Sequence, residues 1–246
     1  MSLKYQTEDD IPESGNDEGD VSVIRSKPPY YTYILIASIV AVAVVQLGTG
    51  LNASIGAAGF DKPLFLRNHE YWRILTGATT HGSIIHVAMN CYAFYSFGRI
   101  FEMLSNRANL AIVFLLSAIG GGILSLVFMP DGVSVGASGG IVGLIGYLAV
   151  YAFRRRQFIS PEFRKNLLIN IGFILVFGLV LYQVIDNFGH IGGMITGAVY
   201  GLIQVPSDER SDPREAGPGL EFAGIAAVGV YIAACILSIL LILRVL

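Results

Sequence analysis

A serine flanked by glycines stands at the start of an apolar stretch, where a hydroxyl group is unexpected. Gly136-Ala137-Ser138-Gly139-Gly140 opens the run from Ile141 to Phe153, and no charged residue occurs between Gly132 and Phe153. Polar groups inside such segments are costly and are usually functional. The sequence therefore predicts that Ser138 is a nucleophile held just inside a membrane.

A serine hydroxyl becomes a nucleophile when a base takes its proton, and imidazole is the usual base. His190 is the natural candidate, because it lies in a segment with glycines at four-residue spacing: Gly189, Gly193, Gly197 and Gly201. Small residues at this spacing let membrane helices approach closely. The pattern predicts a Ser138–His190 dyad. The alternative is that the glycines serve packing alone and that His190 is a hydrogen-bonded structural histidine.

The glycines around Ser138 are expected to have two separate roles. Gly136 and Gly139 would shape the turn and let a substrate backbone come close. Gly140 and Gly143 would let this segment pack against the segment of His190.

A second pair of polar residues occurs in an earlier apolar stretch. His86 and Asn90 are four residues apart, so a helix would place them on one face. Together with backbone N–H groups at the start of the Ser138 helix, they could stabilise the negative charge that develops on an attacked carbonyl. A pair of interhelical hydrogen bonds is the other interpretation. His81 is expected to support or pack this region rather than to do chemistry.

Composition indicates the elements that must carry these residues. Of 246 residues, 54% are hydrophobic and 14% charged, against about 25% charged in soluble proteins. Seven charge-free gaps are each about long enough for a membrane-spanning helix, which needs roughly 20 residues. We therefore expect an all-α polytopic membrane protein. The runs are continuous, whereas a β-barrel would alternate, and no basic cluster with interleaved aromatics suggests nucleic acid as a partner.

The predicted organisation is a six-helix core with additions at both ends. Residues 1–28 form an acidic tail that is expected to be disordered and cytoplasmic, 29–205 the six-span core, 206–219 a polar linker, and 220–246 an additional, appended transmembrane helix. The long connection from Gly50 to Trp72 is expected to lie partly at the membrane interface. The expected spans are Tyr30–Leu47, Ser83–Met103, Leu110–Met129, Ser138–Phe153, Leu167–Gln183, Phe188–Val205 and Glu221–Leu243.

The distribution of Lys and Arg predicts the orientation. With the N-terminus in the cytoplasm, twelve of the 16 Lys and Arg residues fall on the inner side and four on the outer side. The cluster Arg154-Arg155-Arg156 marks the inner end of the segment that starts at Ser138. Ser138, His190, His86 and Asn90 then all lie near the outer face, although none of them entered the count.

Three other interpretations are weaker. The match of residues 136–140 to the G-x-S-x-G nucleophile elbow, with Asp186 and His190 following in order, lacks the α/β sheet that this motif needs. A metal site formed by His81, His86 and His190 lacks carboxylate and thiolate ligands. A transporter would show an inverted repeat and polar groups near the midplane.

In combination, these motifs resemble the rhomboid intramembrane serine proteases, over about Tyr71 to Gln204. The motifs that carry the resemblance are Tyr71-Trp72-Arg73, the tryptophan–arginine motif of the first loop; Thr80-His81-Gly82 through His86 to Asn90; Gly136-Ala137-Ser138-Gly139; and Gly189-His190-Ile191-Gly192-Gly193, continuing to Gly197. Gly189 replaces the alanine that is common before the histidine.

The resemblance implies a serine endopeptidase that cuts transmembrane segments of single-span membrane proteins near the outer membrane face. Ser138 would attack, His190 would act as general base, and His86 and Asn90 would form the oxyanion site. No metal or other cofactor is expected, and the protein would be a multi-pass protein of a plasma or bacterial inner membrane. The alternative is a catalytically inactive rhomboid-like factor that binds membrane proteins or serves their quality control.

Overall fold

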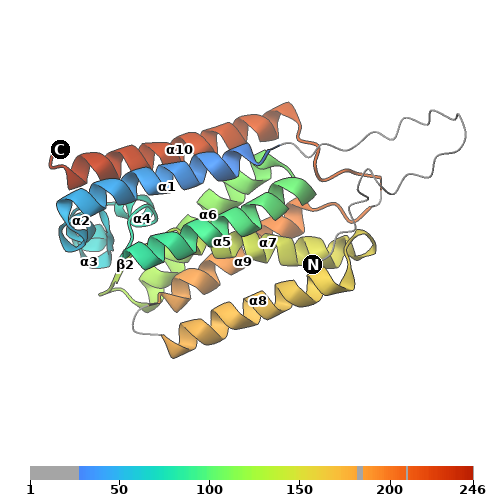
Figure 1. Ribbon diagram of the computed structural model, residues 1–246, viewed down its shortest axis with the longest axis horizontal. Coiled ribbons are helices and arrows are strands. Elements are labelled where there is room, and N and C mark those ends of the chain that lie inside the picture. The colour runs from blue at the N-terminus through green and yellow to red at the C-terminus, as the bar shows by residue number, and fades with distance from the viewer. Residues whose placement is uncertain (1–27, 182–184, 209, 246) are drawn as a thin grey trace, which may run out of the picture.

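The computed structural model describes residues 28–181, 185–208 and 210–245; the predicted acidic tail lies almost wholly outside these residues. Figure 1 shows long helices running roughly alongside one another, with short elements gathered at one end. In chain order the elements are α1 (Tyr30–Thr49), α2 (Leu51–Ala58), β1 (Phe60–Asp61), α3 (Lys62–Arg67), α4 (Arg73–Thr76), α5 (Ile84–Leu104), α6 (Arg107–Phe128), β2 (Val133–Ser134), α7 (Ser138–Arg154), the 3₁₀ turn η2 (Arg156–Phe158), α8 (Pro161–Val180), α9 (Asn187–Gln204) and α10 (Pro218–Ile242).

Each expected span coincides with a helix within the described residues, and the expected end at Gln183 lies outside them. Most ends agree within three residues, but α8 begins at Pro161, well before the expected Leu167, because Ser160 caps its first turn and proline is favoured at that position. Within the described residues, four helices are long and apolar enough to cross a membrane: α1, α6, α8 and α10. The protein is thus a helical membrane protein, while the count of seven spans stays a prediction.

The helices that carry the polar site residues are shorter or less apolar than the four helices named above. The apolar helix α7 has only 17 residues. In α5 and α9, which are 21 and 18 residues long, polar residues and glycines dilute the apolar pattern.

Close backbone contact between α7 and α9 forms the centre of the bundle. A Cβ atom at Gly193 would overlap the carbonyl oxygen of Gly139, and one at Gly197 would overlap that of Gly143. The two helices therefore touch through backbone atoms, as small residues at four-residue spacing allow. Gly143 has the predicted packing role. The same prediction for Gly140 is wrong, because Gly140 faces the ring of Phe114 in α6.

Helix α6 closes the other side of α9. Gly121 of α6 lies against the carbonyl of Gly189, and Gly192 of α9 lies against the carbonyl of Gly120. Helix α9 is thus held between α6 and α7, and its buried residues are all glycines: Gly189, Gly192, Gly193, Gly197 and Gly201.

Helix α10 is part of the bundle, so the expectation of an appended helix is wrong. Figure 1 shows α10 running along α1, and α10 also packs against α6. Gly224 lets it approach the backbone of Ala108. Its Tyr231 hydroxyl donates to the carbonyl of Ala78 over 3.1 Å, and Ser238 shares a 2.7 Å hydrogen bond with Thr79. Helix α10 therefore supports the buried turn that precedes α5.

The connection between α1 and α5 is more ordered than the sequence suggests. It contains α2, β1, α3 and α4, and β1 pairs antiparallel with β2 so that Phe60 lies opposite Ser134. Arg73 is buried and joins these parts, because its guanidinium donates to the carbonyls of Gly59 and Gly56 over 2.9 and 3.3 Å and pairs with Glu70 at 2.5 Å.

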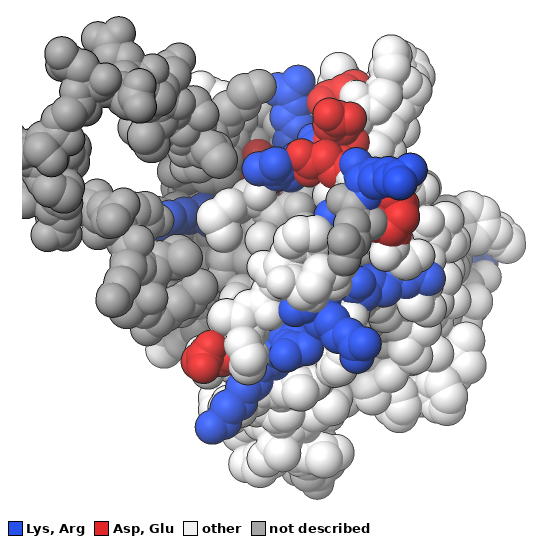
Figure 2. Space-filling view, turned by 90° about the vertical axis from the view of Figure 1, so that its right-hand side faces the viewer, with Lys and Arg blue, Asp and Glu red and all other residues white. Residues whose placement is uncertain are grey.

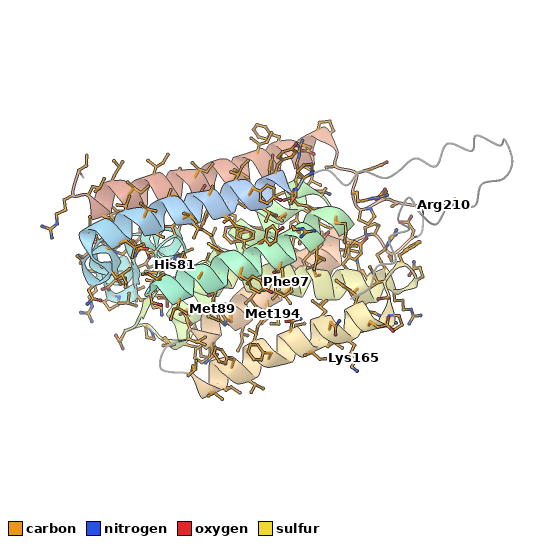
Figure 3. All side chains as sticks on the ribbon, in the orientation of Figure 1. His81, Met89, Phe97, Lys165, Met194 and Arg210 are labelled. Atoms are coloured by element: carbon orange, nitrogen blue, oxygen red, sulfur yellow. The ribbon has the colours of Figure 1, made fainter. Side chains whose placement is uncertain are left out.

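Basic residues gather at the end of the bundle that carries the 206–217 connection. Figure 2 shows Lys and Arg side chains clustered on this face, with a few acidic residues among them. Arg154 at the end of α7 donates to the carbonyls of Leu202 and Val205, and Arg107 at the start of α6 pairs with Glu221. Figure 3 shows Lys165 and Arg210 toward this end and His81 toward the other.

We expect the substitution Gly197→Ala to destabilise the protein, because the added methyl group would overlap the carbonyl oxygen of Gly143. Overpacking of this kind costs typically about 1–3 kcal/mol. Thermal unfolding in detergent micelles, followed by circular dichroism, measures the loss. Gly172→Ala on α8 is the matched control, since a Cβ there meets nothing within 4 Å and alanine favours the helix. Equal midpoints for the two variants would contradict the packing described above.

Candidate active site

Ser138 and His190 lie within hydrogen-bond distance although 52 residues separate them in the sequence. Ser138 is the first residue of α7, His190 is the fourth of α9, and Ser138 Oγ lies 2.8 Å from His190 Nε2. Both residues are half-buried. With Nε2 as acceptor, Nδ1 carries the proton, and this buried nitrogen has no hydrogen-bond partner among the residues that the structure describes. The pair is arranged for proton transfer from the hydroxyl to the imidazole.

The N-terminus of α7 has no side-chain cap. By contrast, α5, α6, α8 and α9 begin after Ser83, Asn106, Ser160 and Asp186, whose side chains each accept a backbone N–H. The first N–H groups of a helix lack intrahelical partners and favour anions. They are therefore available for an oxyanion beside Ser138.

Gly136 has a backbone conformation that an L-residue rarely adopts, with φ of 115°. Its N–H donates to the carbonyl of Gly77 over 2.9 Å. A Cβ atom at this position would lie 2.7 Å from Cε1 and Nε2 of His86. The absence of a side chain thus brings the His86 imidazole against the turn that carries Ser138.

His86 and Asn90 occupy the first turns of α5, as predicted. The Asn90 amide nitrogen donates to the carbonyl of His86 over 2.9 Å, and an amide nitrogen has a second hydrogen to donate elsewhere. Asn90 is buried, and its Oδ1 has no partner among the described residues. His86 therefore reaches the Ser138 turn directly, whereas Asn90 stands one helical turn farther along α5.

His81 is fully buried and stacks edge-on against His86, with ring centroids 5.0 Å apart. Its backbone is held at both polar atoms by Gln46 of α1, over 3.0 and 3.2 Å. His81 thus packs against His86, and its supporting role in the site stays a prediction.

The tryptophan–arginine segment lies apart from the dyad. Tyr71 and Trp72 are 58% and 43% exposed, and the Tyr71 hydroxyl lies 2.8 Å from Nδ1 of His69. Only Arg73 turns inward, where it organises the connection between α1 and α5 as described above. The segment therefore shapes the surroundings of the site and contributes no group to it.

Asp186 belongs to the site region, although the sequence predicts a dyad without it. Its carboxylate accepts hydrogen bonds from Ser125, from Ser134 over 2.5 Å, and from the backbone of Gly189 over 2.8 Å. It caps α9 one turn before His190. The rule that Asp is favoured immediately before a helix could have found the cap, but the contacts with α6 and β2 depend on the tertiary fold.

A cavity of about 50 Å³ adjoins the dyad, a volume that suits one or two water molecules. Its polar lining comes from Ser134, Ser138, Asp186 and His190, and small residues such as Gly121 and Gly139 complete it. Water is thus able to occupy the space next to the hydroxyl.

This fold and site define a class: helical membrane proteins with a serine–imidazole pair at the head of two glycine-packed helices. The family profile described as the rhomboid domain matches residues 68–207. The match covers more than half of the chain, and the chain belongs to the rhomboid family.

Curated relatives include both active and inactive members by name. Rhomboid protease GluP of Bacillus subtilis is 32% identical over 181 residues, which is 72% of this chain and 35% of the relative. RHOMBOID-like protein 6, mitochondrial, of Arabidopsis thaliana is 33% identical over 61% of this chain and 48% of the length of the relative. Inactive rhomboid protein 1 of Papio anubis is 30% identical over 56% of this chain and 16% of the relative. The chain thus spans about a third to a half of the length of the first two.

We expect Gly136→Ala to reduce the reactivity of Ser138 at least tenfold. The new Cβ would displace the His86 ring and strain a backbone with positive φ, which costs on the order of 1–3 kcal/mol. The rate of labelling by a fluorophosphonate probe measures the change. Gly82→Ala, where a Cβ would only touch Val135 at 3.8 Å, is the control; equal labelling of the two variants would show that the turn tolerates a side chain.

Proposed function

We propose that this protein is an intramembrane serine endopeptidase that cuts transmembrane segments of other membrane proteins by a Ser138–His190 dyad. The observation that carries the proposal is the 2.8 Å distance between Ser138 Oγ and His190 Nε2. The membership of the rhomboid family and the likeness to a relative named rhomboid protease support it.

In the proposed reaction, His190 Nε2 takes the proton of Ser138 as Oγ attacks the carbonyl carbon of the scissile peptide bond. The tetrahedral intermediate collapses to an acyl-enzyme when the imidazolium gives its proton to the leaving amine. Water next to the dyad, activated in turn by His190, then hydrolyses the ester and frees Ser138.

The negative charge on the attacked oxygen would be stabilised at the open end of α7. The N–H groups at Ser138 and Gly139, which no side chain caps, would face the developing charge, and the His86 imidazole lies against the same turn. Asn90, whose amide nitrogen makes one hydrogen bond among the described residues, would complete this oxyanion site from α5.

The proposed membrane arrangement has a cytoplasmic N-terminus, six core spans in 29–205, a linker in 206–219 and a seventh span in 220–246. The basic end of the bundle supports it, because positive residues favour the cytoplasmic side. Ser138 lies at the opposite end of α7, roughly 24 Å away at 1.5 Å per residue. The site would then open toward the extracytoplasmic face of a cell membrane, where single-span proteins in the bilayer are the substrates.

The second candidate function is that of an inactive rhomboid-like protein that binds membrane proteins or serves their quality control. The relatives named inactive rhomboid protein 1 favour it. The hydrogen-bonded Ser138–His190 pair favours the enzyme.

We expect Ser138→Ala and His190→Ala each to abolish cleavage of a membrane-anchored reporter, because nucleophile and base act as one unit. Immunoblotting of reporter fragments in cells measures cleavage, with protein level and thermal midpoint as folding controls. Ser38→Ala is the matched control, since this exposed hydroxyl bonds only its own helix. Full cleavage by either dyad variant would refute the protease, and capture of reporter by wild-type protein without any fragment would support the binding factor.

We expect His86→Ala to lower kcat by about 10²–10³-fold, the usual effect of removing one oxyanion donor, and to leave KM nearly unchanged. Steady-state kinetics on a purified reporter in liposomes separate the two constants. A variant that changes KM alone would assign His86 to substrate binding instead.

A further inference from the structure

The carboxylate of Asp186 joins three separate elements next to the dyad. Oδ2 accepts hydrogen bonds from the hydroxyls of Ser125 in α6 and Ser134 in β2, and Oδ1 accepts the N–H of Gly189 in α9. An ionised carboxylate only accepts, so it is able to take all three donors. Asp186 therefore places a full negative charge at the start of α9.

A buried lysine lies in the same region. Lys62 is 0% exposed, and its Nζ has no hydrogen-bond partner among the described residues. The ammonium group lies 5.9 Å from the centroid of the Phe60 ring, within the range of a cation–π contact, and 3.5 Å from the point where a Cβ of Gly132 would stand. Burial lowers the pKa of Lys62, and the carboxylate of Asp186 partly offsets this effect.

These groups share one physical connection to His190. Strand β1, which ends immediately before Lys62, pairs with β2, and Ser134 of β2 donates to Asp186. The carbonyl of Asp186 in turn accepts the N–H of His190 over 3.1 Å. The connection between α1 and α5 is thus tied through two short strands to the turn of α9 that carries the imidazole.

The charge of Asp186 also affects the protonation of His190, because the start of a helix carries a partial positive charge. When His190 takes a proton, its positive charge appears within the first turn of α9, where the positive helix end disfavours it. A carboxylate at the cap offsets this effect, since a nearby opposite charge favours the charged form.

Resting on the proposed function, we infer that Asp186 is a positioning residue for the Ser138–His190 dyad. Its carboxylate, balanced by Lys62, fixes the start of α9 and stabilises the imidazolium that forms as the serine attacks. It acts through the helix end and its charge, without touching the substrate.

The substitution Asp186→Asn removes the charge while asparagine remains a good helix cap. We expect kcat of reporter cleavage and the rate of fluorophosphonate labelling of Ser138 to fall roughly 10- to 30-fold, with KM within about twofold of the wild-type value. The matched control is Asp61→Asn, because Asp61 also caps a helix, α3, in this part of the molecule. A purely structural cap would give the same small effect at both positions, and that result would overturn the inference.

Charge balance supplies the second test. In Asp186→Asn, the lysine is left as a buried cation without its partner, so adding Lys62→Met is expected to recover at least about fivefold in kcat. No recovery, or a further loss, would show that Lys62 does not act through Asp186. If Asp186→Asn fails to fold, Ser134→Ala, which keeps the charge and removes one donor, is expected to slow labelling about threefold; unchanged labelling would contradict the inference.

Failure of the proposed function gives a different result. In that case wild-type protein neither cleaves the reporter nor labels at Ser138. If the wild type does both and Asp186→Asn matches it, only the role of Asp186 is refuted.

Discussion

The close approach of α7 and α9 is the constraint on which the rest of the structure depends. Ser138 and His190 each stand in the first turn of their helix, so their separation is set by the distance between the helix backbones. Glycine at 193 and 197 allows those backbones to touch, at the carbonyls of Gly139 and Gly143. A side chain at 193 or 197 would overlap these carbonyl oxygens, push the helices apart and lengthen the 2.8 Å hydrogen bond of the dyad.

The two helix starts also differ in their capping, which bears on the proposed chemistry. An uncapped α7 presents free N–H groups beside the hydroxyl, while Asp186 caps α9 beside the imidazole. One end thus favours the negative charge of an oxyanion and the other tolerates the positive charge of an imidazolium. The different treatment of two neighbouring helix ends suits acyl transfer, in which both charges form together.

The outer elements hold these two helix ends in register. Helix α10 and Gln46 of α1 fix the turn before α5 through hydrogen bonds to residues 78, 79 and 81. Arg73 fixes the connection that leads into β1, and β1 pairs with β2. The most distant helix in the sequence is therefore as much part of the framework as those with the reactive groups.

The sequence by itself determined the helical membrane character, the positions of the long helices and the four polar residues of the proposed site. It could do so because apolar runs, glycine spacing and isolated polar groups in them are local patterns with a direct physical meaning. Only the tertiary structure decided that Gly139 rather than Gly140 meets α9, that α10 packs into the bundle, and that Asp186 gathers donors from two other elements. Such contacts depend on which faces of distant helices meet, and helical periodicity within one segment does not contain that information.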